Sequence, residues 1–256
     1  MIRHEIHTLQ ASLIFFTRIP GNLRGADPRE SLRHASRYFP FIGWVIGMIG
    51  AGVLAGGTLL FPPSLAILLS MTATILATGA LHEDGFADFC DGFGGGWTKE
   101  RILEIMKDSY IGVFGVIGLF LILGMKMLVL TSLPAAILPI ALISGHSLSR
   151  FVSISLLFTH DYVRDDPSGK SRMVVKRMTR KEFLFVAITG ILPFGVLCLM
   201  TSQWWLLGIE LLVAGCLRWI FGRYLTAKIQ GYTGDCLGAL QQLAEVVFYL
   251  TLVAML

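Results

Sequence analysis

Charged residues are scarce in this chain, at 15% of its 256 residues, whereas a typical soluble domain has about 25%. Hydrophobic residues make up 54% of the chain, and the mean hydropathy is +0.70. A soluble all-helical core is the alternative, and the apolar residues argue against it because they occur in blocks too long for soluble folding. The sequence therefore predicts an integral membrane protein.

Several sequence motifs are absent. The four cysteines, which are Cys90, Cys198, Cys216 and Cys236, form no CxxC pair and have no histidine at zinc-binding spacing. We expect them to be reduced and mostly buried. The HEDGF stretch at 82–86 lacks the second histidine of a zinc protease, and Arg164 stands where a P-loop ending at 169–171 needs glycine. The acidic stretch at 80–97 does not have EF-hand spacing, which argues against calcium sensing.

Seven apolar blocks each have about the length that a membrane-spanning helix needs. They are 40–61, 64–81, 111–133, 139–158, 183–201, 203–221 and 237–256. Backbone polar groups in lipid must be hydrogen-bonded within the segment, so we expect all of them to be helices. The N-terminus does not resemble a cleaved signal peptide, and we expect it to remain as an amphipathic segment. The predicted fold is one domain, 1–256: an all-α polytopic membrane protein with about seven transmembrane helices.

The connections between these blocks are of two kinds. Those at 61–64, 131–139 and 201–203 are short and uncharged, whereas those at 20–39 and 159–182 are rich in arginine and lysine. With seven spans, all the basic connections fall on one face, which the positive-inside rule makes cytoplasmic. We therefore expect an inner-membrane protein whose acidic segment, 82–110, faces the cytoplasm.

Four carboxylates gather in the acidic segment, although the chain has a net charge of +4. They are Glu83, Asp84, Asp88 and Asp91, and the three aspartates are spaced so that they share one face of a helix. Like charges this close are costly unless something positive lies among them. A solvated acidic loop paired with nearby lysine and arginine is one interpretation. The other is a site for a divalent cation, because clustered oxygen ligands suit Mg²⁺, Mn²⁺ or Ca²⁺.

Glycines surround these acids, and Gly94 and Gly95 lie within a run of three. Bare glycine lets a ligand approach the backbone, and successive N–H groups in such a turn can form an anion-binding nest. Carboxylates that hold a cation beside such a nest predict a metal-bridged phosphate site.

A second acidic region occurs in the last apolar block. Asp235 opens it, where a helix N-cap is the simplest explanation. Glu245 lies within the apolar run, where an ionised carboxylate needs a partner or a polar cavity. Gln241, one turn earlier, shares its face. We expect this helix to pack against the acidic segment and to complete its site.

Three further positions carry polar groups within apolar blocks. His146 and Arg150, one turn apart, could bind an anion or make an interhelical bond, and Lys126 could pair with another helix or face water. Gly43 and Gly47 are typical of close helix packing.

The stretch ALHEDGFADFCDGFGGGWTKERILEIMKDSYIGVFGVIGL resembles the central motif of the cobalamin synthase family, the adenosylcobinamide-GDP ribazoletransferases. FFTRIP, GHSLSR and GYTGDCLGALQQLAE extend the resemblance over nearly the whole chain in the expected order. The central block is highly specific, and the shorter pieces are weak individually.

The resemblance implies an enzyme that joins α-ribazole, or its 5′-phosphate, to adenosylcobinamide-GDP with release of GMP and with Mg²⁺ as cofactor. Glu83, Asp84, Asp88 and Asp91 would hold the metal, and Asp91 or Asp235 would take the ribose hydroxyl proton, with Glu245 as a further catalytic group. Arg18, Lys107 and Arg150, together with His146, Gly94 and Gly95, would contact substrate. We expect small-molecule substrates and the lipid bilayer as partners, and no nucleic acid; the oligomeric state is left open.

Two other functions fit the same carboxylates. One is a phospholipid phosphotransferase that uses a CDP-activated donor, although the chain lacks that family's Ala-Arg element after the glycine. The other is a divalent-cation transporter with an acidic vestibule. Release of CMP, or metal flux in liposomes, would distinguish them.

Overall fold

The computed structural model of the protein describes residues 2–21, 31–32, 34–164 and 178–256. Its elements are the helices α1 (Ile2–Phe16), α3 (Phe39–Thr58), α4 (Pro63–Thr78), α5 (Leu81–Gly95), α6 (Lys99–Ile105), α7 (Val113–Ser132), α8 (Leu138–Ile154), α10 (Arg180–Thr201), α11 (Trp205–Ile229) and α12 (Gly234–Met255), with short 3₁₀ helices η1 (Ala35–Tyr38) and η2 (Ser155–Phe158). The one extended pairing in this part of the chain is a bridge between Tyr162 and Tyr232. The predicted all-α fold is confirmed.

Six segments of the described chain are long and apolar enough to cross a membrane. They are Ala35–Thr58, Val113–Ser132, Leu138–Phe158, Arg180–Thr201, Trp205–Ile229 and Gly234–Met255. Each coincides with one of the predicted apolar blocks, so the polytopic membrane fold is confirmed.

The remaining predicted span, 64–81, differs from a simple crossing. Helix α4 has only 16 residues, and α5 continues from it at an angle of 87°. The bend occurs at Gly79 and Ala80, whose φ angles of 67° and 57° are left-handed and end the α-helical path. Counted together, α4 and α5 make a broken seventh span or a re-entrant segment.

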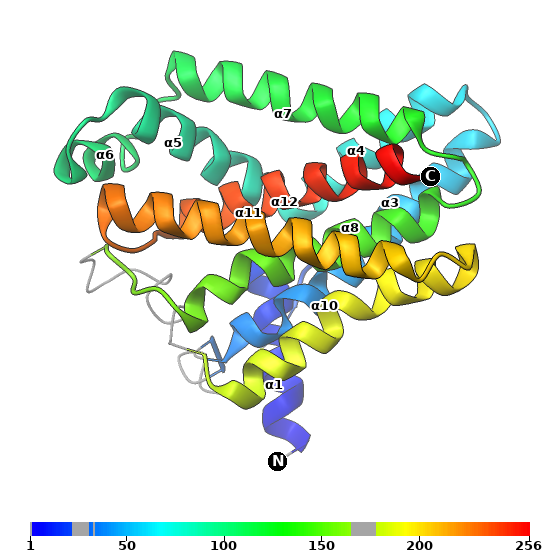
Figure 1. Cartoon of the computed structure of the whole chain (residues 1–256), viewed down its shortest axis with the longest axis horizontal. Coiled ribbons are helices and arrows are strands. Elements are labelled where there is room, and N and C mark those ends of the chain that lie inside the picture. Colours follow the sequence, from blue (N-terminus) through cyan, green and yellow to red (C-terminus); the bar gives the residue numbers. More distant parts are fainter. Residues whose placement is uncertain (1, 22–30, 33, 165–177) are drawn as a thin grey trace.

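The short uncharged links lie at one end of the molecule and the acidic helix at the other, as the two kinds of connection predict. The short links between α3 and α4, α7 and α8, and α10 and α11 lie at one end of the molecule, on the right in Figure 1. The acidic helix α5 and the link from α11 to α12 lie at the other end. Most of the basic residues predicted at that end, Arg24, Arg29, Arg33, Lys170, Arg172, Lys176 and Arg177, lie outside the described residues.

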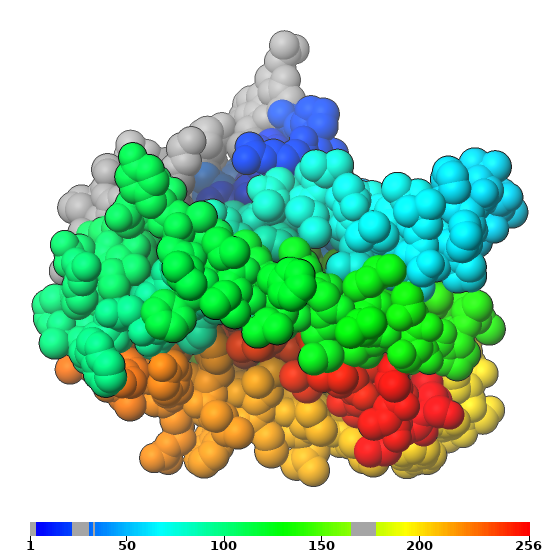
Figure 2. All heavy atoms as spheres, turned by 90° about the horizontal axis from the view of Figure 1, so that it is seen from above, coloured from blue at the N-terminus to red at the C-terminus, as the bar shows by residue number. Residues whose placement is uncertain are grey.

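Helices α8 and α12 form the centre of the bundle. Within the apolar 18-residue stretch of each span, 83% is buried in Leu138–Phe158, which contains α8, and 67% is buried in α12. The corresponding share is 28% in both α7 and α11. Figure 2 shows the C-terminal end of α12 (red) at the surface, whereas most of the rest of this helix lies behind α7 (green) and beside α11 (orange). Large apolar side chains such as Phe120 and Leu212 remain exposed on these outer helices, as expected of surfaces that face lipid.

Glycines let two pairs of helices approach closely. A Cβ on Gly43 or Gly47 would lie 2.4 Å and 2.5 Å from backbone atoms of α8, which confirms the predicted packing role of these glycines in α3. A Cβ on Gly85 would lie 3.0 Å from the Cα of Asp235, and one on Gly238 would lie 3.2 Å from the carbonyl oxygen of His82. Gly85 and Gly238 thus allow α5 and α12 to pack closely, which brings the two acidic regions together.

Candidate active site

Helix α5 presents its acids at different depths. Asp84 is exposed, Asp88 is half-buried, and Glu83 and Asp91 are buried, at 7% and 8% exposure. Glu83 and Asp84 lie in the first turn, where the helix dipole favours negative charge. The helix predicted for these residues is confirmed, and its acids separate into three environments.

Asp91 is bound to the start of α7. Its Oδ2 accepts a hydrogen bond of 2.7 Å from the Gly112 N–H, and its Oδ1 accepts one of 2.8 Å from the Gly115 N–H. A Cβ on either glycine would lie 2.4 Å from a carboxylate oxygen of Asp91, so only glycine permits this approach. Asp91 therefore caps α7 from a neighbouring helix, where backbone donors and the helix dipole compensate its charge.

Asp84 and Asp235 line a cavity of about 180 Å³ at the end of the bundle where α5 and α12 begin. Arg164 also lines it and lies 2.8 Å from Oδ2 of Asp235. The same guanidinium nitrogen donates a hydrogen bond of 2.7 Å to the Met106 carbonyl after α6. The segment that follows η2 is thereby anchored beside the first turn of α12.

Asp84, Asp88 and Asp235 form the carboxylate cluster of this site. Asp88 is close enough to Asp235 and Asp84 for their negative charges to act on it, and Arg164 is the nearby opposite charge. Three carboxylates against one guanidinium leave an excess of negative charge, which a bound cation would relieve.

The donor chemistry of this cluster fits Mg²⁺. Among the described residues, no group of three or more His, Cys, Asp or Glu side chains is placed so that these side chains alone could hold a metal ion. Mg²⁺ does not need one, because it commonly keeps several waters and binds one or two carboxylates together with substrate phosphates. The oxygen-only cluster could supply such ligands.

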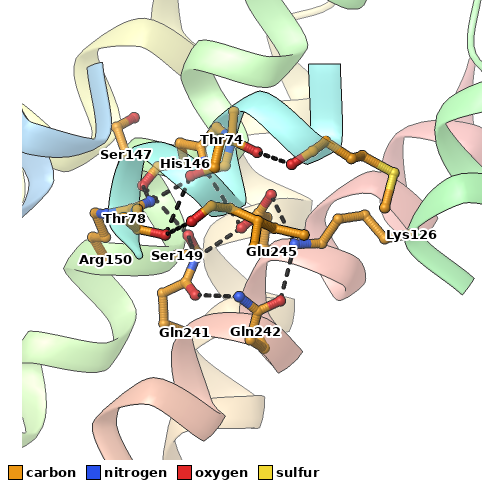
Figure 3. Close-up of polar contacts among 12 residues, drawn as sticks. Thr74, Thr78, Lys126, His146, Ser147, Ser149, Arg150, Gln241, Gln242 and Glu245 are labelled. Carbon is orange, nitrogen blue, oxygen red and sulfur yellow. Dashed lines mark hydrogen bonds and ion pairs between the residues drawn. The ribbon is translucent and has the colours of Figure 1, made fainter. Parts of the chain in front are cut away.

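A second group of polar side chains lies inside the bundle (Figure 3), and its members are buried. Its centre is Glu245 of α12, which is 1% exposed. Oε1 of Glu245 lies 3.3 Å from the Lys126 ammonium of α7, and Oε2 lies 3.4 Å from Nδ1 of His146 and 2.7 Å from the Gln241 amide nitrogen. The Tyr249 hydroxyl lies 3.3 Å from Oε1. The predicted need of Glu245 for a partner is met by four of them.

Arg150 belongs to the same enclosed group. Its Nη1 donates to the His146 carbonyl at 2.8 Å and lies 3.2 Å from Nδ1 of His146. Its guanidinium lies over the Phe39 ring at 5.4 Å from the centroid. Of the two interpretations of His146 and Arg150, the structure favours buried bonding within the bundle, because both side chains are buried and the free space within the whole network is only about 10 Å³.

Glu83 connects this enclosed network to the acidic helix. Its Oε1 accepts a hydrogen bond of 2.9 Å from the Gln242 amide nitrogen. The Gln242 carbonyl oxygen in turn accepts one of 2.9 Å from Lys126. Oε2 of Glu83 is buried and has no hydrogen-bond partner among the described residues. Residues 83, 126, 242 and 245 thus tie α5, α7 and α12 together.

The predicted nest at Gly94 and Gly95 is wrong. Both residues belong to the last turn of α5, and the next N–H, that of Gly96, bonds to the Gly92 carbonyl at 2.8 Å. In a helix these N–H groups point along the axis to preceding carbonyls and do not converge on an anion. A Cβ on Gly94 would lie 2.6 Å from the Phe114 ring, so this glycine allows close packing instead.

Arg18 and Lys107 lie apart from the cavity lining. Arg18 is exposed, and its backbone N–H donates a hydrogen bond of 2.7 Å to the Ala77 carbonyl. Its side chain lies across Gly79, at the bend before α5. Lys107 is exposed just after α6. Neither side chain contacts the carboxylate cluster within the described chain.

The pattern of the cobalamin-5-phosphate synthase family matches residues 8–253. This chain belongs to that family. Curated relatives include the adenosylcobinamide-GDP ribazoletransferases of Shewanella frigidimarina, 42% identical over 98% of this chain and 95% of the relative, and of Shewanella amazonensis, 40% identical over 98% and 96%. The enzyme of Vibrio cholerae is 37% identical over 100% and 97%. No solved structure matches the chain.

The sequence did not predict that two further residues, His82 and Arg164, lie at this site. His82 is 3% exposed and lines both the cavity and the enclosed network, and its only signal was its place beside Glu83. Arg164 was counted among the loop charges that set topology, and nothing in the sequence pairs it with Asp235. Both roles depend on contacts between segments that are far apart in the chain.

Proposed function

We propose that the chain is an adenosylcobinamide-GDP ribazoletransferase, which joins α-ribazole or its 5′-phosphate to adenosylcobinamide-GDP and releases GMP. The observation that carries this proposal is the family match over residues 8–253, with relatives of that name about 40% identical over nearly their whole length. The carboxylate cluster beside a cavity supports it, because splitting a diphosphate requires compensation of charge on both fragments.

Within the carboxylate cluster, Asp84 and Asp88 are our proposed Mg²⁺ ligands, with Glu83 beside them, and Asp235 is the proposed proton acceptor. When bound there, Mg²⁺ would neutralise charge on the diphosphate oxygens. Asp91 was also a predicted ligand. Because two backbone N–H groups occupy its oxygens, we now assign it the task of fixing α7 against α5.

The chain's own residues would orient the acceptor and take its proton. A ribose hydroxyl oxygen attacks the phosphorus that carries the cobinamide, a new P–O bond forms, and the bond from that phosphorus to the oxygen of GMP breaks. The hydroxyl proton passes to a carboxylate of the cavity. Asp235 suits this task because Arg164, at 2.8 Å, fixes its orientation.

The enclosed network fixes the helices that carry the carboxylate cluster. Glu245, His146 and Arg150 are buried and bonded to one another or to Lys126, so we propose that they position α5 and α12 and do not touch substrate. This revises their predicted catalytic and substrate-binding roles. Arg18 and Lys107 remain our proposed phosphate contacts for a donor that extends beyond the cavity.

We further propose that the cavity opens to the cytoplasm in the cell inner membrane. The support is the distribution of charge in the sequence, where with seven spans the acidic segment and the arginine-rich connections fall on the same face of the membrane. The short uncharged links lie at the end of the bundle opposite the acidic helix.

The test is GMP release by the purified protein in liposomes. We expect release from adenosylcobinamide-GDP only when α-ribazole or its phosphate and Mg²⁺ are both present. The absence of release from protein that is folded and inserted would contradict the proposal, and CMP release from a CDP-activated lipid donor would assign the site to phospholipid synthesis.

A further inference from the structure

The cavity beside the carboxylate cluster has an aromatic, apolar interior. Phe15, Phe16 and Phe39 line it from α1 and α3, and Leu157 lines it from η2. The Phe16 and Phe39 ring centroids lie 4.3 Å apart. Their planes are tilted by 34°, and aromatic faces of this kind provide surfaces that suit a planar ligand.

Its size limits what can enter. At about 180 Å³ the cavity is smaller than the roughly 300–1,000 Å³ of pockets that hold a whole drug-sized ligand. A corrinoid macrocycle is much larger than this space. The cavity therefore suits one planar group of a larger substrate, with the rest of that substrate lying outside it.

Its polar groups are placed at one side. Asp84, Arg164 and Asp235 lie where α5 and α12 begin, and His82 forms part of the wall. The His82 ring stacks on Phe39, with centroids 5.6 Å apart and planes at 23°. Its Nε2 is buried and has no hydrogen-bond partner within the described chain. Such a buried nitrogen is unusual and is satisfied when a ligand supplies a partner.

These features distinguish the two nucleobases of the proposed reaction. Guanine carries several donors and acceptors, and those that face the apolar wall of Phe15, Phe16, Phe39 and Leu157 would be left unpaired, because the charged groups lie at one side only. The benzimidazole of α-ribazole is a two-ring, mostly apolar base whose polar atoms are few. We infer that the cavity is the acceptor pocket: it packs the benzimidazole base against its aromatic side chains and thereby holds the attached ribose at Asp84 and Asp235. This inference rests on the proposed function.

A rim substitution tests the pocket without disturbing the core. Leu81 lines the cavity and is 40% exposed, so Leu81→Trp fills space from the edge. We expect its Kd for α-ribazole, measured by equilibrium dialysis on the full chain in detergent, to rise about tenfold or more, because overpacking opposes entry of the base. The Kd for adenosylcobinamide-GDP should change less than about twofold, a change within ordinary surface effects. Leu128→Trp on the outer face of α7, 66% exposed, is the matched control.

His82→Phe provides an independent variant, since it keeps a ring to stack on Phe39 and removes the nitrogen. We expect the KM for α-ribazole to rise about fivefold, the loss of one hydrogen bond, with kcat little changed. A merely structural role of His82 would instead lower the melting temperature and kcat together and leave the KM for α-ribazole in place.

The outcomes separate this inference from the proposed function. GMP release with an unchanged acceptor KM in Leu81→Trp would overturn the acceptor pocket and leave the function standing. Weaker donor binding with unchanged acceptor binding would assign the cavity to guanine and overturn it equally. Wild-type protein that binds α-ribazole but releases no GMP would contradict the function and leave the pocket, and failure to bind α-ribazole at all would overturn both.

Discussion

The amide nitrogen of Gln242 lies 2.9 Å from Oε1 of Glu83, so the last helix of the chain holds the first acid of the acidic helix. The same Gln242 accepts a hydrogen bond from Lys126 and donates one of 3.1 Å to Gln241. One neutral side chain therefore joins a buried carboxylate to a buried ammonium. The carboxylate cluster at the mouth of the bundle depends on this internal support.

Gln242→Leu should weaken that support. The change leaves Oε1 of Glu83 without its partner and removes one of the two contacts of Lys126, which keeps Glu245. We expect about 2–3 kcal/mol of lost stability, the cost of an unmet buried polar group. Thermal unfolding in detergent, followed by circular dichroism, measures it. Gln10→Leu on the half-buried face of α1 is the control. Equal melting temperatures of the two variants would show that the Gln242 bridge contributes nothing.

Lys126 and Glu245 form an ion pair whose removal should be strongly non-additive. Lys126→Met leaves a buried carboxylate without its main cation, which typically costs about 3–5 kcal/mol. The double change with Glu245→Gln should recover much of this loss, because the amide at position 245 carries no charge that needs Lys126 as a partner. A double-mutant cycle of unfolding free energies gives the coupling, and additive losses would contradict the pairing.

Asp91 and Asp88 should respond in opposite ways to the same substitution. Asp91→Asn removes the negative charge from the N-terminus of α7 and one of two accepting oxygens, so we expect about 1 kcal/mol of lost stability. Asp88→Asn relieves repulsion with Asp84 and Asp235 and should leave stability unchanged or higher. Parallel melting curves make the comparison. Equal destabilisation of both variants would argue against the capping role of Asp91.

Gly85→Ala tests the close contact of α5 with α12. Its Cβ would lie 3.0 Å from the Cα of Asp235, so the helices must separate and the carboxylate cluster must widen. We expect a cost of about 1–3 kcal/mol, as for other overpacked contacts, together with reduced GMP release. Gly124→Ala on α7, with open space around its Cβ, is the matched control and should be neutral or slightly stabilising. Normal turnover in Gly85→Ala would mean that the spacing is not critical.

Hydropathy was sufficient to predict most of this fold. The predicted blocks fall on the observed helices because burial in lipid requires long apolar helices, a property that each segment carries in its own residues. The exception was the block at 64–81, where Gly79 and Ala80 turn the chain by 87°. The left-handed backbone of Ala80 could not be predicted, because a Gly-Ala pair within an apolar block does not mark a bend.

The candidate site was predicted less completely, for a physical reason. Spacing placed Asp84, Asp88 and Asp91 on one face of a helix, and the polar groups of the last apolar block suggested that Asp235 lies nearby. It could not distinguish glycines that admit a ligand from glycines that admit a helix, because both uses require only a missing Cβ. Gly94 was therefore misassigned. The pairing of Lys126 with Glu245 could not be predicted either, because the two residues are 119 positions apart and only the packing of α7 against α12 brings them together.

The most direct test of the central claim is the rate of GMP release by Asp88→Asn, measured beside wild-type protein with adenosylcobinamide-GDP, α-ribazole and Mg²⁺. We predict a folded, inserted variant whose turnover falls by about 10²–10³ or more, as when a charge-stabilising group is lost from an active site. Wild-type turnover in Asp88→Asn, with unchanged dependence on Mg²⁺, would contradict the assignment of this carboxylate cluster as the active site.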